Sequence, residues 1–218
     1  MTPSNRRKSS QIYLQQSILL TDKYIEFARE GTLRRLEELR IKLADAESLI
    51  SGKACVYATG SFGRLEAGPH SDLDLFIVVD ETKNVEGVKV RQLDGIEEIR
   101  LKYKLIMAGK KCQIADFDGG GKYLESHTIE AFVKDLGTRE EDYNNTLTGR
   151  LLLLLESRPL LGEDLYGHLL NNVIDAYFGD FEGNERNFLP AFLTNDILRM
   201  WRTFCVNYEQ SRKKGGSG

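Results

Sequence analysis

Cysteine is scarce in this chain of 218 residues, which contains three. Cys55, Cys112 and Cys205 lie far apart, and an odd number of cysteines suits neither a framework of disulfides nor a zinc site. A free cysteine usually behaves as a small buried apolar side chain. We therefore expect reduced thiols in the core of a cytoplasmic protein.

Long apolar runs are also lacking. The run Leu151–Leu155 is bounded by Arg150 and Glu156, and it is far shorter than the roughly 20 apolar residues that a membrane-spanning helix needs. The mean hydropathy is -0.37, and hydrophobic residues make up 41% of the chain, as in ordinary globular proteins. We expect a soluble protein with no membrane partner.

The sequence has no excess of positive charge either. Its formal net charge is -3 at pH 7, so no broad basic surface marks a nucleic acid as the main partner, although a local basic groove stays open. His127 and His168 have no metal-like spacing with any cysteine, and we expect His70 to be exposed in a loop.

The chain begins with a basic stretch followed by a helical pattern. We expect residues 1–20 to form a mobile N-terminal arm. Apolar residues recur at helical spacing from Thr21 to Ile50, which predicts one long helix, or two helices broken near Gly31. At the other end, residues 213–218 are typical of a flexible tail.

Short strands are predicted in the next part of the chain. Ala54–Ala58 is typical of a buried strand and Leu73–Val79 of a second one, with a turn rich in glycine and polar residues between them. Lys111–Phe117 alternates loosely as a third strand. Gly119–Gly121 then interrupts the pattern and is our candidate hinge or boundary.

Helix starts follow from the spacing of capping residues. Asp94 and Glu97 predict a helix that runs to about Ala108 and ends at Gly109. Thr138 and Glu141 have the same spacing. They predict a helix over residues 139–157 that Pro159 closes, and two more helices are expected near residues 163–178 and 190–211.

These elements predict an α/β (α+β) fold with a small mixed β-sheet, a long N-terminal helix and a C-terminal helical domain. We assign residues 21–120 to the core with its leading helix and residues 121–212 to the helical domain. A cleft between the two parts is the expected binding site.

Two acidic residues alternate with two leucines at the start of the second predicted strand. In a strand, Asp72 and Asp74 project from one face while Leu73 and Leu75 point into the core. Two like charges on one face repel each other unless a cation compensates them, and carboxylate oxygens are natural ligands of Mg²⁺. The pair therefore indicates a metal site that handles phosphate.

The turn before this strand carries residues suited to phosphate binding. Gly60 allows close approach of the backbone to a ligand, and Ser61 supplies a hydroxyl. At a turn from a strand into a helix, backbone N–H groups can receive the oxygens of a triphosphate. Arg64, one turn into the predicted helix, is placed to pair with a phosphate.

This combination resembles the DNA polymerase β-like nucleotidyltransferase superfamily, whose signature is a Gly-Ser turn, a spacer and Asp-hydrophobic-Asp. Here the spacer is Phe62–Ser71, and the resemblance covers about residues 54–118. Within the superfamily, Arg64, Glu66 and Ser71 make the motif similar to nucleotidyltransferases related to the uridylyltransferase of the nitrogen-regulatory PII system.

The resemblance implies a third carboxylate from a neighbouring strand, for which Asp116 is favoured over Asp118. It implies two Mg²⁺ or Mn²⁺ ions, held by the catalytic and metal-binding set of Asp72, Asp74 and Asp116. An NTP such as ATP would be the substrate, attacked at its α-phosphate with release of pyrophosphate. The nucleotide-binding residues would be Gly60, Ser61, Arg64 and Ser71.

The acceptor of the nucleotidyl group stays open. The resemblance to the PII uridylyltransferase favours a partner protein, and a small molecule or a nucleotide end is also compatible. Synthesis of an oligonucleotide or second messenger in a bacterial defence system is an alternative. A third hypothesis is a non-catalytic regulatory or antitoxin-like protein that binds its partner through the helical half.

Overall fold

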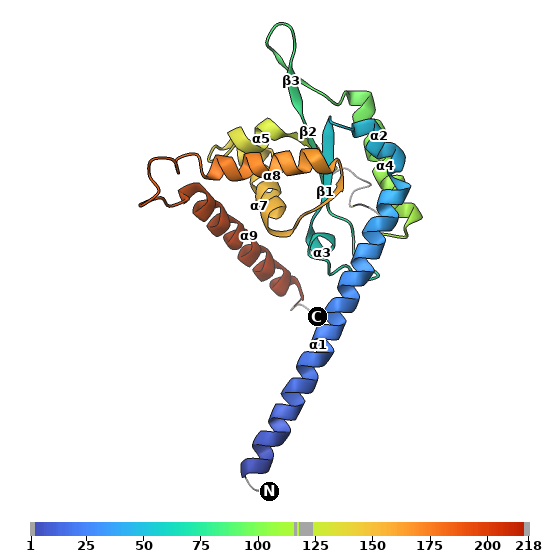
Figure 1. Ribbon diagram of the computed structural model, residues 1–218, viewed down its shortest axis with the longest axis vertical. Helices are drawn as coiled ribbons and strands as arrows, with labels where there is room; N and C mark the ends of the chain where they lie inside the picture. Colours follow the sequence, from blue (N-terminus) through green and yellow to red (C-terminus); the bar gives the residue numbers. More distant parts are fainter. Residues whose placement is uncertain (1–2, 116, 118–123, 216–218) are drawn as a thin grey trace.

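The structure, a computed structural model, describes residues 3–115, 117 and 124–215, and the side chains of residues 22–115, 117 and 124–213. A mixed β-sheet lies between helices, and the first half of the long helix α1 (Pro3–Lys42) projects away from the rest of the chain (Figure 1). The predicted fold class is therefore confirmed.

The sheet has four strands in the order β5-β2-β1-β6. Strand β1 (Ala54–Ala58) pairs antiparallel with β2 (Leu75–Val79) and with β6 (Arg158–Leu161), whereas β2 pairs parallel with β5 (Ser126–Thr128). Strand β1 has the predicted bounds. The strands β5 and β6 were not predicted, and they come from the part of the chain that we assigned to the helical domain.

Alternate residues of β1 face two separate cores. Val56 belongs to the core that α1, α2 (Ala44–Ile50) and α4 (Gly95–Lys111) form with the sheet. Tyr57 belongs to the second core, which contains residues of α5 (Ile129–Lys134), α7 (Thr146–Glu156) and α8 (Glu163–Tyr177). Because both faces of the sheet are covered, the apolar run of β1 has no polar face.

The helix α1 continues through Gly31, so of the two alternatives the break at Gly31 is wrong, and a long helix passes this position. A helical glycine costs only about 1 kcal/mol relative to alanine, which is too little to end a long helix. The break lies at Leu43 instead, between α1 and α2. The backbone of residues 3–20, expected as a mobile arm, is helical.

The helix α4 begins as predicted. Asp94 Oδ1 accepts a hydrogen bond from the Glu97 N–H at 2.8 Å, and Glu97 Oε2 accepts one from the Asp94 N–H at 3.1 Å. The predicted end at Gly109 is wrong, because the helix continues to Lys111. A single glycine again does not end a helix that packs against the sheet.

The third predicted strand, Lys111–Phe117, is wrong for every residue of it that the structure describes. Lys111 ends α4, Cys112 and Gln113 form a turn, and residues 114, 115 and 117 have no regular structure. Gln113 has a φ of 55°, in the left-handed region, which is incompatible with a strand. Asp116, Asp118 and Gly119–Gly121 lie outside the described residues.

The predicted helix over residues 139–157 is two helices, α6 (Glu140–Tyr143) and α7. Asn145 separates them with a left-handed φ of 55°. The predicted capping box is also wrong: the Thr138 hydroxyl donates to the Asp135 carbonyl oxygen, and Glu141 binds Arg150 instead. Pro159 lies in the edge strand β6, where a missing N–H is tolerated.

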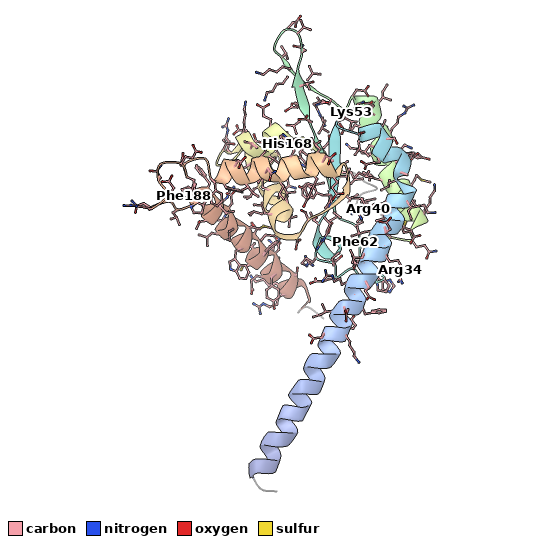
Figure 2. The ribbon with its side chains drawn as sticks, in the orientation of Figure 1. Arg34, Arg40, Lys53, Phe62, His168 and Phe188 are labelled. Carbon is pink, nitrogen blue, oxygen red and sulfur yellow. The ribbon has the colours of Figure 1, made fainter. Side chains whose placement is uncertain are left out.

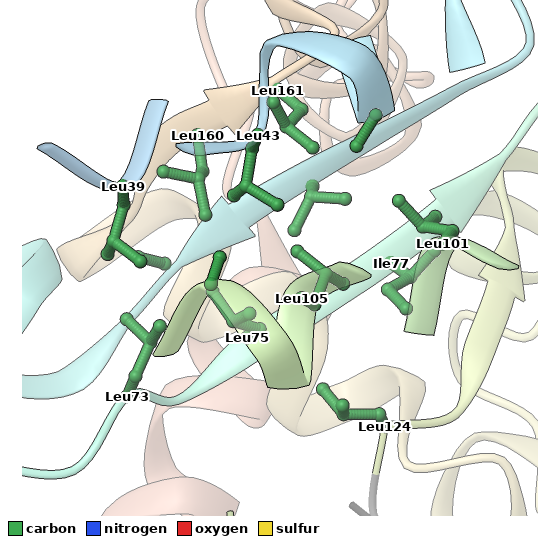
Figure 3. Packing of buried hydrophobic residues seen from close by; sticks show 14 of the residues in the cluster. Leu39, Leu43, Leu73, Leu75, Ile77, Leu101, Leu105, Leu124, Leu160 and Leu161 are labelled. Carbon is green, nitrogen blue, oxygen red and sulfur yellow. The ribbon is translucent and has the colours of Figure 1, made fainter. Parts of the chain in front are cut away.

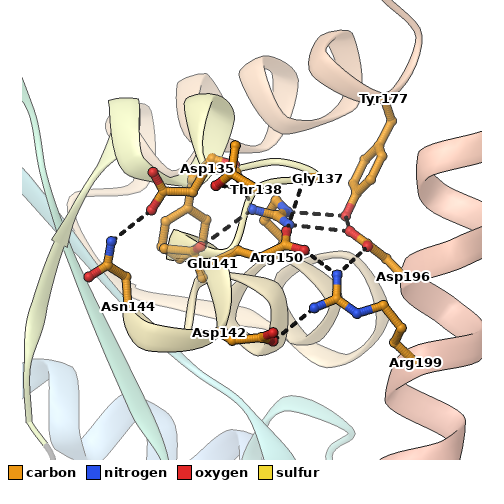
Figure 4. A network of polar contacts seen from close by, with 12 residues as sticks. Asp135, Gly137, Thr138, Glu141, Asp142, Asn144, Arg150, Tyr177, Asp196 and Arg199 are labelled. Carbon is orange, nitrogen blue, oxygen red and sulfur yellow. Dashed lines mark hydrogen bonds and ion pairs between the residues drawn. The ribbon is translucent and has the colours of Figure 1, made fainter.

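A buried ionic network joins α6, α7, α8 and α9 (Ala191–Gly215) (Figure 4). Arg150, 0% exposed, contacts the carboxylates of Glu141 and Asp196, and its Nη2 lies 3.2 Å from Asp196 Oδ2. The Tyr177 hydroxyl donates to Asp196 at 2.8 Å, and Arg199 binds Glu141 from the other side. The network fixes α7 against three other helices.

The predicted helices near residues 163–178 and 190–211 are confirmed as α8 and α9. A hairpin of β3 (Glu81–Lys83) and β4 (Lys89–Arg91) extends from the sheet. Among the described residues, no helix combines the length and apolar character needed to cross a membrane.

The three cysteines have different environments. Cys55 is buried in β1, and burial raises the pKa of its thiol to about 12. Cys112 is half-buried, and Cys205 is exposed on α9. Core packing is therefore confirmed for Cys55 and wrong for Cys205.

Candidate functional site

A cleft of about 430 Å³ lies where β1 ends and β2 begins, beside α7. Because β1 and β2 are antiparallel, the residues that follow β1 and those that precede β2 meet at this end of the sheet. The described lining residues are Thr59, Gly60, Asp72, Leu73, Asp74, Leu75, Phe76, Phe117, Leu124, Asn145, Leu152 and Glu156.

Asp72 and Asp74 both line this cleft, although they precede β2 rather than lie in it. The predicted alternation holds: both aspartates are exposed, whereas Leu73 and Leu75 are buried. Figure 3 shows the two leucines in the core among leucines of α1 and α4. The Thr59 N–H donates to the Asp74 carbonyl oxygen at 3.0 Å, which extends the pairing of β1 and β2 to the second aspartate.

Gly60 faces the second aspartate directly. Its φ is 60°, in the left-handed region, and a Cβ built on it would lie 2.6 Å from Asp74 Oδ2. A side chain at this position would collide with the carboxylate and strain the backbone. The structure therefore accounts for glycine here by its contact with the acidic pair.

The short helix α3 (Gly60–Gly63) carries the rest of the turn. Phe62 is fully buried and lies beside α1 (Figure 2). The Arg35 guanidinium lies 4.8 Å from the centre of its ring. Ser61 is half-buried. A Cβ on Gly63 would lie 1.8 Å from the Glu156 carbonyl oxygen, so α3 packs directly on the end of α7.

Arg64 follows α3 and ends it, instead of lying one turn inside a longer helix. Its Nε donates to Glu66 at 2.9 Å, and its Nη1 donates to Glu156 at 2.5 Å. Hydrogen bonds from Arg64 to Glu156 and then to Glu66 raise the pKa of the guanidinium. Arg64 is therefore engaged by two carboxylates, of which Glu156 lines the cleft, whereas Arg64 itself is not among the described lining residues.

The spacer is tied to α1. The Ser71 hydroxyl accepts the Gly68 N–H at 2.9 Å, which gives Ser71 a role in shaping the turn. Arg35 Nη1 donates to the Gly68 carbonyl oxygen at 2.6 Å, and the Thr32 hydroxyl accepts the Ala67 N–H at 2.9 Å. These bonds position the segment that leads into Asp72.

Sequence reasoning missed Glu156, the last residue of α7. Its Oε1 accepts the Gly60 N–H at 3.2 Å, and its Oε2 binds Arg64. Thr59, whose buried hydroxyl oxygen has no hydrogen-bond partner within the described structure, and Asn145 also line the cleft unpredicted. Nothing in the local sequence marks Glu156 or Asn145, because most of their neighbours in the cleft are distant in the chain, whereas Thr59 directly precedes Gly60.

The oxygen donors of Asp72 and Asp74 fit the preference of Mg²⁺ for carboxylates combined with water and phosphate. Over the described residues alone, no group of three histidine, cysteine, aspartate or glutamate side chains is arranged to hold a metal. The predicted third ligand, Asp116 or its alternative Asp118, lies outside those residues.

A comparison with known families bears on this site. Residues 36–117 match the family model of the nucleotidyltransferase domain. The matched region includes the turn at Gly60, both aspartates and the strands β1 and β2, and it supports the resemblance to the DNA polymerase β-like superfamily. No curated protein matches the chain.

Proposed function

We propose that the protein is a metal-dependent nucleotidyltransferase that moves an NMP from an NTP to a hydroxyl acceptor. The observation that carries this proposal is the contact of the Gly60 turn with Asp74, next to Asp72, in one open cleft within the matched domain. The contact supports the proposal, because a turn of this kind would suit a phosphate and the neighbouring carboxylates would suit a cation.

In the proposed reaction, the acceptor oxygen forms a bond to the α-phosphorus while the bond from that phosphorus to the bridging oxygen breaks. Pyrophosphate leaves, and the hydroxyl proton passes to a carboxylate or to water. Asp72 and Asp74 would hold Mg²⁺ or Mn²⁺, which supplies charge neutralisation and lowers the pKa of the acceptor hydroxyl. Gly60, Ser61 and Arg64 would orient the triphosphate, and Ser71 would hold the spacer.

The test is transfer of label from α-labelled NTPs with Mg²⁺ or Mn²⁺, with pyrophosphate release measured in parallel. The variants Asp72→Asn and Asp74→Asn should abolish both signals. Asp80→Asn is the matched control, since Asp80 follows β2 at its opposite end and accepts a hydrogen bond from Gln92 at 2.7 Å. Absence of label transfer, pyrophosphate and metal-dependent nucleotide binding in the wild type would refute the proposal.

The acceptor separates the two catalytic versions of this proposal. A nucleotide adduct on a protein, detected by mass spectrometry, would support a role like that of the PII uridylyltransferase. Free oligonucleotides or cyclic dinucleotides would support second-messenger synthesis. Both products require the acidic pair.

A non-catalytic partner-binding protein is the second candidate function. Exposed apolar side chains on α9 favour it, because Ile197, Trp201, Phe204 and Tyr208 recur at helical spacing and are each about half or more exposed. If the double variant Asp72→Ala, Asp74→Ala keeps full cellular function, binding rather than catalysis is the role.

A further inference from the structure

Glu156 contacts two of the groups that the motif assigns to phosphate, the Gly60 N–H and the Arg64 guanidinium. One carboxylate oxygen accepts the Gly60 N–H at 3.2 Å, and the other binds Arg64 Nη1 at 2.5 Å. A carboxylate that bridges a backbone N–H and a guanidinium makes the same kind of contacts as a phosphate. These two donors of the turn are therefore already engaged by a side chain of the protein.

The position of Glu156 in its helix is unfavourable for an acid. It is the last residue of α7, where the helix dipole disfavours negative charge. Its backbone is fixed, since α3 packs against its carbonyl oxygen at Gly63. Its side chain is therefore the part of this contact that can move.

The charges around the cleft oppose binding of a triphosphate while Glu156 stays in place. Each charged side chain described in its lining is acidic, namely Asp72, Asp74 and Glu156. Cations at the aspartates would compensate those two charges. Glu156 would remain as a further negative charge directly beside the phosphates.

A second hollow beside Glu156 has space for its side chain. It has a volume of about 380 Å³, and its lining includes Glu156, Arg64, Arg158 and Tyr166. Arg158 is exposed there and is a cation that a displaced carboxylate can approach. Glu66 would still hold Arg64 through Nε, which leaves Nη1 for a phosphate oxygen.

We propose that Glu156 is an internal competitor of the triphosphate, which it blocks from Gly60 and Arg64 until the nucleotide displaces it toward the second hollow. This inference rests on the proposed function and adds a regulatory residue to the same site. Binding of nucleotide then exchanges one anion for another at the turn. The Glu156 carboxylate therefore raises the nucleotide concentration that this exchange requires.

The experiment is calorimetric titration of the full chain with inorganic tripolyphosphate and with ATP, each with Mg²⁺. Glu156→Ala should bind both ligands about threefold to tenfold more tightly than the wild type, because a competing charged contact is gone. Glu156→Gln should show a smaller gain, since its amide oxygen can still accept the Gly60 N–H. Circular dichroism checks that each variant is folded.

Glu66→Gln is the matched control, because it removes a partner of Arg64 without touching Gly60. Its gain in affinity for tripolyphosphate and ATP should be smaller than that of Glu156→Ala. Equal or weaker binding by both Glu156 variants, with the wild type binding ATP, would overturn the competitor role and leave the proposed function standing. If neither wild type nor variants bind either ligand, both ideas fail together.

Discussion

Charged side chains are arranged in opposite ways near the first half of α7 and near its last residue. Near its first half, Arg150 is buried against Glu141 and Asp196, and opposite charges are matched within the protein. Near its last residue, Asp72 and Asp74 lie exposed in a cleft whose charged lining is acidic among the residues that the structure describes. Burial of charge demands a partner of opposite sign, whereas an exposed acidic pair can keep its sites for a cation.

This difference assigns the first half of α7 to stability and its last turn to function. The ionic network holds α7 in place, and α7 in turn contributes part of the lining of the cleft. A substitution in the network should therefore act mainly on folding, and one at the aspartates mainly on activity.

The largest effect is expected from Arg150→Ala. It would leave Glu141 and Asp196 buried without their shared cation, and breaking a buried ion pair in this way costs about 3–5 kcal/mol of unfolding free energy. Urea unfolding measures it. Arg139→Ala, at an exposed pair with Glu140, is the control and should leave the midpoint unchanged. Equal midpoints for both variants would show that the network does not stabilise the fold.

Asp74→Asn should lower the rate of NMP transfer by about a hundredfold or more, since a cation ligand contributes several kcal/mol of transition-state stabilisation. Its thermal midpoint should fall far less than that of Arg150→Ala, because the Asp74 side chain is exposed whereas Arg150 is buried. Labelled-NTP kinetics and a melting curve on the same sample test both points. A large fall in melting temperature would place Asp74 with the structural charges instead.

Gly60→Ala should cost stability by about 1–3 kcal/mol, through strain at positive φ and collision with Asp74. Gly87→Ala is a matched control, because Gly87 has a φ of 77° but no atom within 4 Å of the added Cβ. It therefore reports the backbone strain alone. Equal losses in the two variants would mean that the contact with Asp74 contributes nothing.

Local signals explain which elements were predictable. The strand β1 is an apolar run buried on both faces, and the Asp94–Glu97 capping box is complete within four consecutive residues. The strands β5 and β6 lack such a pattern, because Ser126–Thr128 and Arg158–Leu161 depend on pairing with β2 and β1. Their strand conformation is imposed by the neighbouring strands rather than by their own residues.

In the site too, only residues that belong to a local sequence motif were predictable. Gly60, Asp72 and Asp74 were predictable because their spacing is a local motif, and the structure brings them into one cleft. Glu156 was missed because its partners Gly60 and Arg64 lie 96 and 92 residues away. The assignment of Asp116 as third carboxylate stays a prediction.

The smallest effect is expected from the acid response of the network. Burial alone would raise the pKa of Glu141, but hydrogen bonds from Arg199 and Arg150 lower it below its ordinary value. Since the folded-state pKa is lower than the unfolded one, Glu141 contributes stability above its unfolded pKa of about 4.3, and this contribution is lost as pH falls through the folded value. Unfolding free energies measured from pH 6 downward should therefore fall less steeply for Glu141→Gln than for the wild type. If the unfolding free energies of both proteins fell with the same slope against pH, Glu141 would titrate alike in the folded and unfolded states. The ion pairs around Arg150 would then not distinguish this part of α7 from the part at the cleft.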